Sequence, residues 1–239
     1  MEKNKYVIVM AAGHGSRMGA AIPKQFIELE GKPILQRTIE KFAYAVPDIK
    51  VVTVLPKDYV EGWKSLCNQN NFYFPQQLVE GGITRFHSVR NALSRIPDGA
   101  LVAIHDGVRP LVTPELIRRM FERMSRERAI IPVLPSVDTL KAVRAEKDQD
   151  GKTVLHSIPG VVLDRSEIYR AQTPQIFHSE DIKRAYEQAY DTAFTDDASV
   201  AEKMNIPLSY IEGERYNIKI TTKDDLDFAK AILSLEIMV

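Results

Sequence analysis

Short runs of apolar, mostly β-branched residues recur along the chain without alternating polar positions. They are Tyr6–Met10, Val51–Leu55, Ala100–His105 and Ala129–Val133. Runs of this length with no polar face are typical of strands that are buried on both sides of a parallel sheet. The pattern therefore predicts the central strands of an α/β fold.

Apolar residues between these runs are spaced three and four positions apart, which is typical of helices with one buried face. The clearest examples are residues 34–42 and 89–96. Residues suited to capping mark further helix starts at Thr113, Ser179 and Thr222. The alternation predicts a single doubly wound, Rossmann-like, mostly parallel sheet, with its ligand site at the carboxyl ends of the strands.

One stretch interrupts the alternation. Val137–Val143 and Thr153–Ile158 read as two strands joined by a turn that contains an Asp-Gly pair. We expect residues 136–166 to form a β-hairpin arm that projects from a single domain of residues 1–239. An isolated hairpin is only marginally stable in water, so a second subunit is the natural surface for it to pack on.

Charge and composition restrict the classes of partner. Lys plus Arg number 32 and Asp plus Glu also number 32, so the chain lacks the basic excess of proteins that bind nucleic acids or anionic membranes. We therefore expect neither partner, and any phosphate site must be a local cluster of cations. Hydrophobic residues make up 44% of the chain, which is ordinary for a globular protein.

Cysteine and histidine offer no metal cage. Cys67 is the only cysteine, which excludes an intramolecular disulfide. The histidines lack ligand spacing, and His105, inside a predicted strand, is expected to lie in the core. The first apolar run is too short to span a bilayer and no signal-peptide cleavage site follows it. These features favour a cytoplasmic protein.

The segment AAGHGSRMGAAIPKQ, residues 11–25, directly follows the first predicted strand and is rich in small residues. The small residues at its start are Ala11, Ala12, Gly13 and Gly15. Without side-chain bulk, backbone N–H groups can approach a nucleotide and donate to its phosphates. Arg17 and Lys24 add permanent cations, so the segment is a candidate triphosphate site.

Two better-known glycine-rich motifs do not fit this segment. A P-loop needs Gly-Lys where Met18 and Gly19 stand, and the dinucleotide fingerprint needs its third glycine at position 18. A glycine-rich turn with solvated cations is the alternative interpretation, and the segment alone does not decide between them.

The segment resembles the A-A-G-x-G-x-R-M…P-K-Q signature of nucleotidyltransferases that activate sugars and sugar alcohols, especially the 2-C-methyl-D-erythritol 4-phosphate cytidylyltransferase family. Other segments resemble this family in the same order, from about Tyr6 to about Leu226. The resemblance implies a homodimeric enzyme that couples CTP to 2-C-methyl-D-erythritol 4-phosphate in isoprenoid precursor synthesis. It also implies Mg²⁺ held mainly by phosphate oxygens, with no direct protein ligand and Asp106 nearby.

The segment EGGITRFHSVRNAL, residues 80–93, resembles the family's G-G-x-x-R-x-x-S-V element. The resemblance implies that Gly82 and the backbone after it read the pyrimidine edge, together with Arg85 and Ser88. A glycine turn that caps a helix at Thr84 is the alternative.

The segment AIHDGVRPLV, residues 103–112, resembles the family's H-D-x-x-R-P element. This assigns Asp106 to the nucleotide and the substrate hydroxyls, and Arg109 to the substrate side of the pocket. Gly107 and Val108 stand where the family often has two alanines, which leaves fine specificity open.

The arm and the segment after it carry further elements of this resemblance. PSVDTLK contains Thr139, and VVLDRSEIYRAQTPQIF contains Arg165 and Thr173. All three are implied to bind substrate, and Arg165 is implied to reach across to the neighbouring subunit's substrate phosphate. An Arg fork suits a phosphomonoester because two parallel N–H donors match two oxygens. The alternative is a surface ion pair of Asp164 with Arg165.

FTDDASVAE and ERYNIKITTKDDL resemble the family's last elements and contain Thr195 and Lys219. Thr195 is implied to bind substrate, although it also suits a helix cap. Lys219 lies between Ile218 and Ile220 on a predicted strand, so it points away from an apolar face. Arg17, Lys24 and Lys219 are the expected catalytic cations.

Three other functions remain in view. Ribitol-5-phosphate cytidylyltransferase has a similar motif set. A non-catalytic nucleotide-sensing module would keep the fold but does not need all of the cations. A dinucleotide oxidoreductase lacks support because Met18 replaces the required glycine.

Overall fold

The computed structural model describes residues 3–13 and 22–235. Its main sheet has eight strands: β1 (Lys5–Met10), β4 (Lys50–Leu55), β5 (Gln76–Glu80), β6 (Leu101–Asp106), β7 (Ala129–Pro135), β10 (Tyr169–Ala171), β11 (Gln175–His178) and β12 (Ser209–Glu212). The α-helices in the described ranges are α1 (Ile34–Ala45), α2 (Val60–Gln69), α3 (Arg85–Leu93), α4 (Pro114–Arg123), α5 (Ser179–Ala185), α6 (Asp197–Lys203) and α7 (Lys223–Ser234). Shorter elements are the 3-10 helices η2 (Lys24–Phe26), η3 (Lys57–Tyr59) and η4 (Arg165–Glu167), and a small sheet of β2 (Glu28–Leu29) and β3 (Lys32–Pro33).

The four strands predicted from the apolar runs are β1, β4, β6 and β7. Strands β5, β4, β1 and β6 lie side by side and parallel, and β11 follows beside β6 in the antiparallel direction. β7 pairs with β10 and β11 antiparallel and with β12 parallel. The predicted mostly parallel α/β sheet is confirmed, with β10 and β11 as antiparallel insertions.

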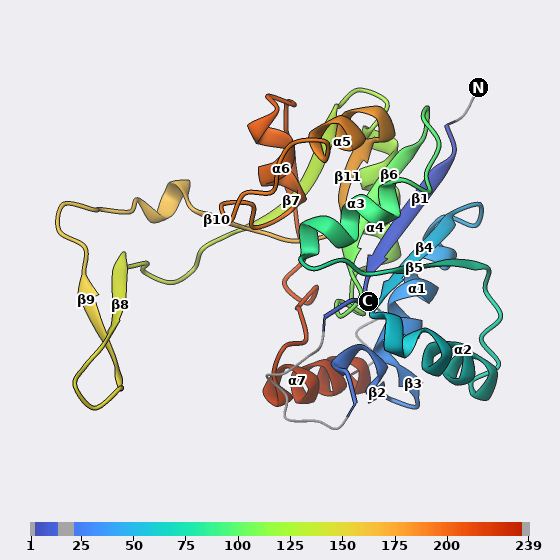
Figure 1. Ribbon diagram of the computed structural model, residues 1–239, viewed down its shortest axis with the longest axis horizontal. Coiled ribbons are helices and arrows are strands. Elements are labelled where there is room, and N and C mark those ends of the chain that lie inside the picture. Colours follow the sequence, from blue (N-terminus) through green and yellow to red (C-terminus); the bar gives the residue numbers. More distant parts are fainter. Residues whose placement is uncertain (1–2, 14–21, 236–239) are drawn as a thin grey trace.

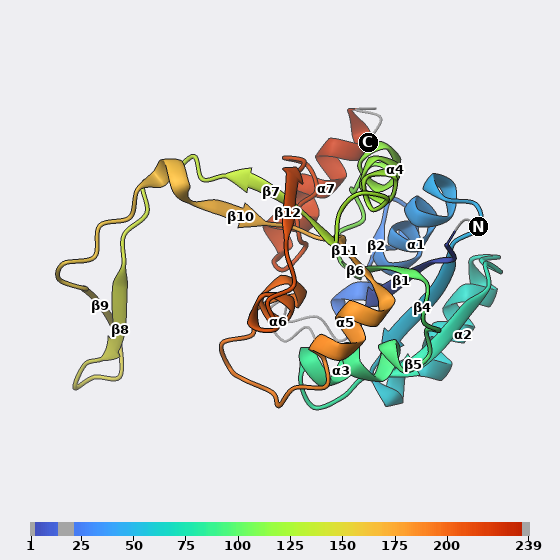
Figure 2. The same cartoon turned by 90° about the horizontal axis from the view of Figure 1, so that it is seen from above.

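Helices cover both faces of the sheet, as the strands without polar alternation require. Val7 and Val9 of β1 pack into one apolar cluster with α1, α2 and α4, whereas Ile8 packs into a second cluster with α3, α5 and α6. Figure 2 shows α1 and α4 on one side of the sheet and α3 and α5 on the other. None of the helices within residues 3–13 and 22–235 is long and apolar enough to cross a membrane.

A third apolar cluster joins α7 to the loop that follows β6. It includes Leu29, Ile34, Leu111, Ile220 and Leu226, and Figure 1 shows α7 beside β2 and β3. The Ile220 N–H donates to the Val108 carbonyl oxygen at 2.9 Å. This cluster carries the segment before α7 back to the carboxyl end of β6.

The arm projects away from the sheet (Figure 1). Its strands β8 (Val143–Lys147) and β9 (Thr153–Ser157) pair with each other, and every residue of both is exposed. Gly151 turns the chain at a φ of 75°, in the left-handed region that favours glycine. The expectation of a first strand at Val137–Val143 is wrong. The two strands separate beyond the hydrogen bond from the Ile158 N–H to the Ala142 carbonyl oxygen, so residues 137–142 form an irregular connection at the base of the arm.

The predicted helix caps are observed at two of three positions. Thr113 accepts a hydrogen bond from the Leu116 N–H, and Thr222 forms a capping box with Asp225. The cap at Ser179 is wrong, because this residue is already the first of α5. Its hydroxyl oxygen accepts from the Ala100 N–H at 3.0 Å, which ties α5 to the start of β6.

Candidate active site

A cavity of about 330 Å³ lies at the carboxyl ends of β1, β5 and β6. We call it the carboxyl-edge cavity. Its lining residues are Met10, Ala11, Ala12, Gly13, Lys24, Gln25, Gly82, Ile83, Thr84, Arg85, Ser88, Asp106, Val108 and Lys219. Ligands of open α/β sheets bind at this edge.

The chain leaves β1 in a tightly held bend. The Ala11 N–H donates to the Val54 carbonyl oxygen at 2.9 Å, and the Gln25 amide donates to the carbonyl oxygens of Ala11 and Gly13 at 2.7 and 3.2 Å. A Cβ atom on Gly81 would lie 2.6 Å from the Ala12 Cβ, so the two loops meet where only glycine fits. The backbone at residues 11–13 is therefore fixed at the cavity wall.

Two of the predicted loop residues, Gly15 and Arg17, lie outside the described residues. Lys24 starts η2 and lines the cavity together with Lys219. Cations that are far apart in the sequence thus face one space, as a triphosphate site requires.

The turn after β5 is held by the Ser88 side chain. The Ser88 hydroxyl accepts from the Gly82 N–H and donates to the Thr84 carbonyl oxygen, both at 2.9 Å, and Thr84 caps α3. A Cβ atom on Gly82 would lie 2.5 Å from the His87 Cβ. Ser88 therefore shapes the turn that faces the cavity, and the helix cap at Thr84 that the alternative interpretation of this segment requires is present.

Arg85 binds a carboxylate from a distant helix. Its Nη1 and Nη2 atoms donate to Asp197 Oδ1 and Oδ2 at 2.8 and 2.5 Å, and the Tyr186 hydroxyl donates to Oδ1 at 2.6 Å. Burial opposes the charge on Arg85, but Asp197 and Asp106 outweigh it and raise the pKa of the guanidinium above its ordinary value. The cavity wall at Arg85 is thereby tied to α6.

Asp106 is the one carboxylate among the described residues that line the cavity. Its Oδ2 atom lies 3.0 Å from Lys219 Nζ and 3.2 Å from Arg109 Nε. Burial acts to raise the pKa of this carboxyl, but Lys219, Arg85 and Arg109 hold it well below its usual range. Asp106 is therefore anionic at neutral pH and orders two cations around it.

A buried hydrogen-bond chain lies directly behind Asp106. Its backbone N–H donates to Thr173 Oγ1 at 3.1 Å, and Thr173 Oγ1 lies 3.1 Å from His105 Nδ1. His105 Nε2 lies 3.1 Å from the Arg109 carbonyl oxygen, which can only accept, so this nitrogen carries the proton. Burial lowers the pKa of His105 to about 4, and the ring is neutral at neutral pH. His105 lies in the core, as its place in a strand predicts.

A family model described as IspD, 2-C-methyl-D-erythritol 4-phosphate cytidylyltransferase, matches residues 6–235. The chain belongs to this family. A 2-C-methyl-D-erythritol 4-phosphate cytidylyltransferase from Bacteroides thetaiotaomicron is 43% identical over 95% of this chain and 98% of its own length. One from Azobacteroides pseudotrichonymphae is 44% identical over 97% of this chain and 99% of its own length.

Solved structures agree with this family. The 4-diphosphocytidyl-2C-methyl-D-erythritol synthase of Anaerococcus prevotii is 28% identical, with a TM-score of 0.77 over 97% of this chain and 99% of that one. The Francisella tularensis 2-C-methyl-D-erythritol 4-phosphate cytidylyltransferase is 33% identical, with a TM-score of 0.75 over 96% of this chain and 99% of that one.

Several predicted site residues lie away from the carboxyl-edge cavity. Thr195 lines a neighbouring cavity of about 880 Å³ between α6, β10 and β12. It does not cap α6; Asp196 does, in a capping box with Ser199. Thr139 and Arg165 are exposed at the base of the arm, where Arg165 Nη1 donates to the Val137 carbonyl oxygen at 3.2 Å.

Two further sequence expectations are corrected by the geometry. Lys219 does not lie on a strand, although Ile218 and Ile220 pack into the α7 cluster and leave Lys219 pointing to the cavity. Asp164 accepts from the Ser166 N–H and hydroxyl, at 2.9 and 2.7 Å, and caps η4 rather than pairing with Arg165.

Sequence reasoning missed two residues that hold the site together, Gln25 and Asp197. Both stand inside the matched P-K-Q and T-D-D-A-S segments, but the sequence does not indicate which residue each side chain contacts. Their burial and their contacts, 12 to 14 and 112 residues away in sequence, could not be read from local pattern.

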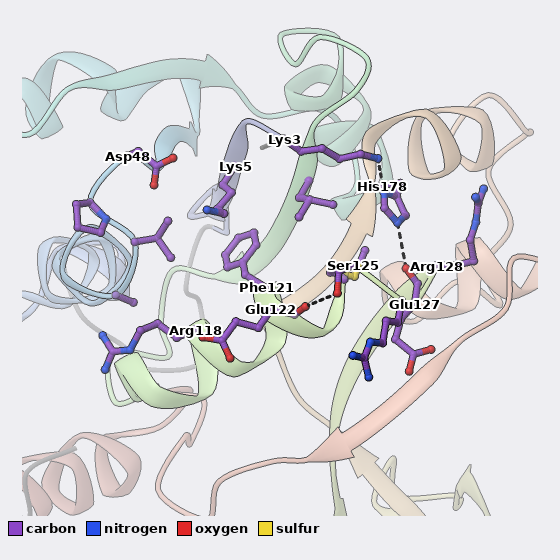
Figure 3. Close-up of a pocket in the computed structure, with 16 residues that line it drawn as sticks. Lys3, Lys5, Asp48, Arg118, Phe121, Glu122, Ser125, Glu127, Arg128 and His178 are labelled. Atoms are coloured by element: carbon purple, nitrogen blue, oxygen red, sulfur yellow. Dashed lines mark hydrogen bonds between the residues drawn. The ribbon is translucent and has the colours of Figure 1, made fainter. Parts of the chain in front are cut away.

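A larger cavity of about 760 Å³ lies at the opposite edge of the sheet, where β1 and β6 begin (Figure 3). Lys3 Nζ donates to His178 Nδ1 at 3.0 Å, and His178 Nε2 donates to the Glu127 carbonyl oxygen at 3.0 Å. Arg128 on its rim pairs with Asp181 at 2.6 Å. The residues singled out by the motifs do not line it, so the chemistry favours the smaller carboxyl-edge cavity.

Proposed function

We propose that this chain is a cytidylyltransferase that couples CTP to 2-C-methyl-D-erythritol 4-phosphate, giving the CDP-alcohol and pyrophosphate for isoprenoid precursor synthesis. The observation that carries the proposal is the carboxyl-edge cavity, where a bare backbone bend faces Lys24, Lys219 and Asp106. Family membership over residues 6–235 supports this choice of substrates.

In the proposed reaction, an oxygen of the substrate phosphate attacks the α-phosphorus of CTP. A new P–O bond forms, the bond to the β-phosphate breaks, and pyrophosphate leaves with the electron pair. Such transfers depend mainly on positioning and charge neutralisation, so no protein nucleophile is needed. Lys24 and Arg17 would hold the triphosphate, and Lys219, fixed against Asp106, would stabilise charge at the α-phosphate.

The residues present fit Mg²⁺ that is held mainly by the nucleotide. Within residues 3–13 and 22–235 there is no group of three or more His, Cys, Asp or Glu suited to a metal. Asp106 lines the same cavity as Lys24 and Lys219 and would stand near the ion. The ion would supply positive charge that offsets part of the charge on the phosphates.

We further propose a cytoplasmic homodimer in which residues 1–239 form one domain and residues 136–166 embrace the second subunit. Large apolar side chains exposed on this arm support the proposal; they are Val137, Val143, Val154, Leu155, Val161, Val162 and Leu163. Thr139 and Arg165 would then reach the substrate bound by the partner subunit, and Thr195 would contact substrate from the subunit that supplies Asp106. Thr173, expected from the sequence to bind substrate, is buried and instead holds the backbone of Asp106 through its hydroxyl.

A pyrophosphate-release screen tests the function. CTP, UTP and ATP are each offered with 2-C-methyl-D-erythritol 4-phosphate or ribitol 5-phosphate, and we expect release only with CTP and the methylerythritol phosphate. Release with ribitol 5-phosphate would reassign the substrate, whereas CTP binding without any release would favour a nucleotide sensor.

A further inference from the structure

Gln25 is a buried polar residue at the end of residues 11–25, the segment that carries the candidate triphosphate site. It is 1% exposed, and its single amide nitrogen donates to the carbonyl oxygens of Ala11 and Gly13 at 2.7 and 3.2 Å. The side chain therefore ties the end of residues 11–25 to their beginning. The bond lengths lie within the normal range for N–H···O contacts.

The chemistry of these contacts is specific to an amide. A glutamine nitrogen carries two N–H donors, whereas a carboxylate can only accept and a thioether donates nothing. Two carbonyl oxygens on one side of the loop are satisfied by this one group. The Ala11 N–H donates to the Val54 carbonyl oxygen at 2.9 Å, so the bend at residues 11–13 is held from both sides where it lines the cavity.

The backbone that carries Gln25 is itself anchored in the core. Phe26 is buried and stacks on Trp63 at a centroid distance of 5.9 Å, and its N–H donates to the Pro23 carbonyl oxygen at 2.9 Å. Lys24, on the other side of Gln25, lines the cavity. The turn that contains Lys24, Gln25 and Phe26 is thus anchored by Phe26. It carries Lys24 directly and holds residues 11–13 through the Gln25 amide.

We propose that Gln25 is a positioning residue for the nucleotide: its amide fixes the backbone of Ala11 and Gly13 relative to Lys24, so that both meet the same triphosphate. This inference rests on the proposed function only for the identity of the nucleotide. It predicts that Gln25 affects the binding and use of CTP and does not affect the binding of the polyol phosphate.

The test compares Gln25→Met, which keeps the length and most of the volume but has no donors, with Gln25→Glu, which turns a carboxylate toward two carbonyl oxygens. We expect kcat/KM for CTP to fall about tenfold to a hundredfold in Gln25→Met, the loss of two hydrogen bonds, and further in Gln25→Glu. The KM for the polyol phosphate, measured at saturating CTP, stays within about twofold of wild type. Gln69→Met, the same change at an exposed position, is the control.

Calorimetric titration of CTP gives a second readout that does not depend on turnover. If Gln25 serves only packing, Gln25→Met binds CTP like wild type, and that result overturns the proposal. If Gln25→Met weakens the binding of CTP and of the polyol phosphate by the same factor, that result overturns the proposal as well. Should Gln25→Met not fold, Gln25→Asn carries the same test, because it keeps the amide but is one methylene too short to reach both carbonyls. Failure of wild-type turnover with intact CTP binding would count against the proposed reaction and not against Gln25.

Discussion

The carboxyl-edge cavity and the arm hold their polar residues in opposite ways. Around the cavity, Asp106, Arg85 and Gln25 are each fixed by contacts with other parts of the same chain. Along the arm, β8 and β9 pair only with each other among the described strands, and all of their residues are exposed. The groups around the cavity are therefore held in place within one chain, whereas the paired strands of the arm leave their side chains exposed.

The largest effect on stability is expected from breaking the ion pair of Arg85 with Asp197 at the cavity wall. Arg85→Met would leave the Asp197 carboxylate, which is fully buried, with the Tyr186 hydroxyl as its remaining side-chain partner among the described residues. Removing one member of a buried ion pair costs about 3–5 kcal/mol, so we expect a loss of this size in the free energy of unfolding measured in urea.

The double variant Arg85→Met/Asp197→Leu is the control for this prediction. It removes the uncompensated charge and should recover most of the stability. A single variant that lost less than about 1 kcal/mol would mean that the pair is no more than a surface contact.

Acid should weaken the core behind Asp106. His105 is buried with a pKa of about 4, whereas the unfolded chain has the ordinary value near 6.5. Between these two values the unfolded state binds more protons, so stability is present above about pH 6.5 and is lost as the pH falls toward about 4. The total contribution is about 3 kcal/mol.

Urea unfolding of wild type and His105→Gln at several pH values between these limits isolates this contribution. The difference between the two proteins should shrink as the pH falls, because the variant has no group to titrate at this position. A constant difference across the range would show that the pKa of His105 is the same in the folded and the unfolded chain.

The cavity cations should matter chiefly for turnover. Lys24→Ala or Lys219→Ala removes a preorganised donor, and we expect kcat for pyrophosphate release to fall by about 100-fold or more. Lys57→Ala, at an exposed position outside the cavity, should have no effect. Near-normal release by either cavity variant would contradict the catalytic role, provided that both remain folded.

The sequence predicted the framework because strands buried on both faces leave a local signal. The four apolar runs and the caps at Thr113 and Thr222 depend on neighbouring residues, and all are observed. The segment Val137–Val143 has the same apolar character, yet the hairpin begins only where it ends. Whether a segment of the arm forms a strand depends on whether another segment pairs with it, and the local sequence pattern does not indicate this.

The candidate site was predictable as a set of residue types but not as a set of contacts. The matched motifs gave Lys24, Lys219 and Asp106, and all three line the cavity. The assignment of Arg85 and Ser88 to the nucleotide did not anticipate that their polar groups bind Asp197, Gly82 and the Thr84 carbonyl. Such pairings form across the fold and depend on tertiary structure.

A substitution of Arg165 tests whether the arm contributes to the site of a second subunit. If the arm serves a second subunit, Arg165→Ala should raise the KM for the polyol phosphate about tenfold to a hundredfold and leave CTP binding unchanged, because it removes a bidentate phosphate contact. Mixed dimers of Arg165→Ala with Lys24→Ala subunits should regain activity, since one of the two sites then has both residues. Absence of any recovery in the mixture would place Arg165 and Lys24 in sites of the same subunit or remove Arg165 from the reaction.

The smallest effect on the stability of the fold is expected for the exposed apolar residues of the arm. Val162 is 93% exposed, so Val162→Ser should change the unfolding free energy of a dissociated subunit by less than about 0.5 kcal/mol. In a dimer built through the arm the same change removes buried apolar surface, and sedimentation at decreasing concentration should show earlier dissociation. Lys203→Ser, on a helix of the body, provides a comparison. Unchanged dissociation in Val162→Ser would mean that Val162 is not buried in a dimer interface. A wild-type protein that is monomeric and fully active would mean that each subunit forms a complete site by itself.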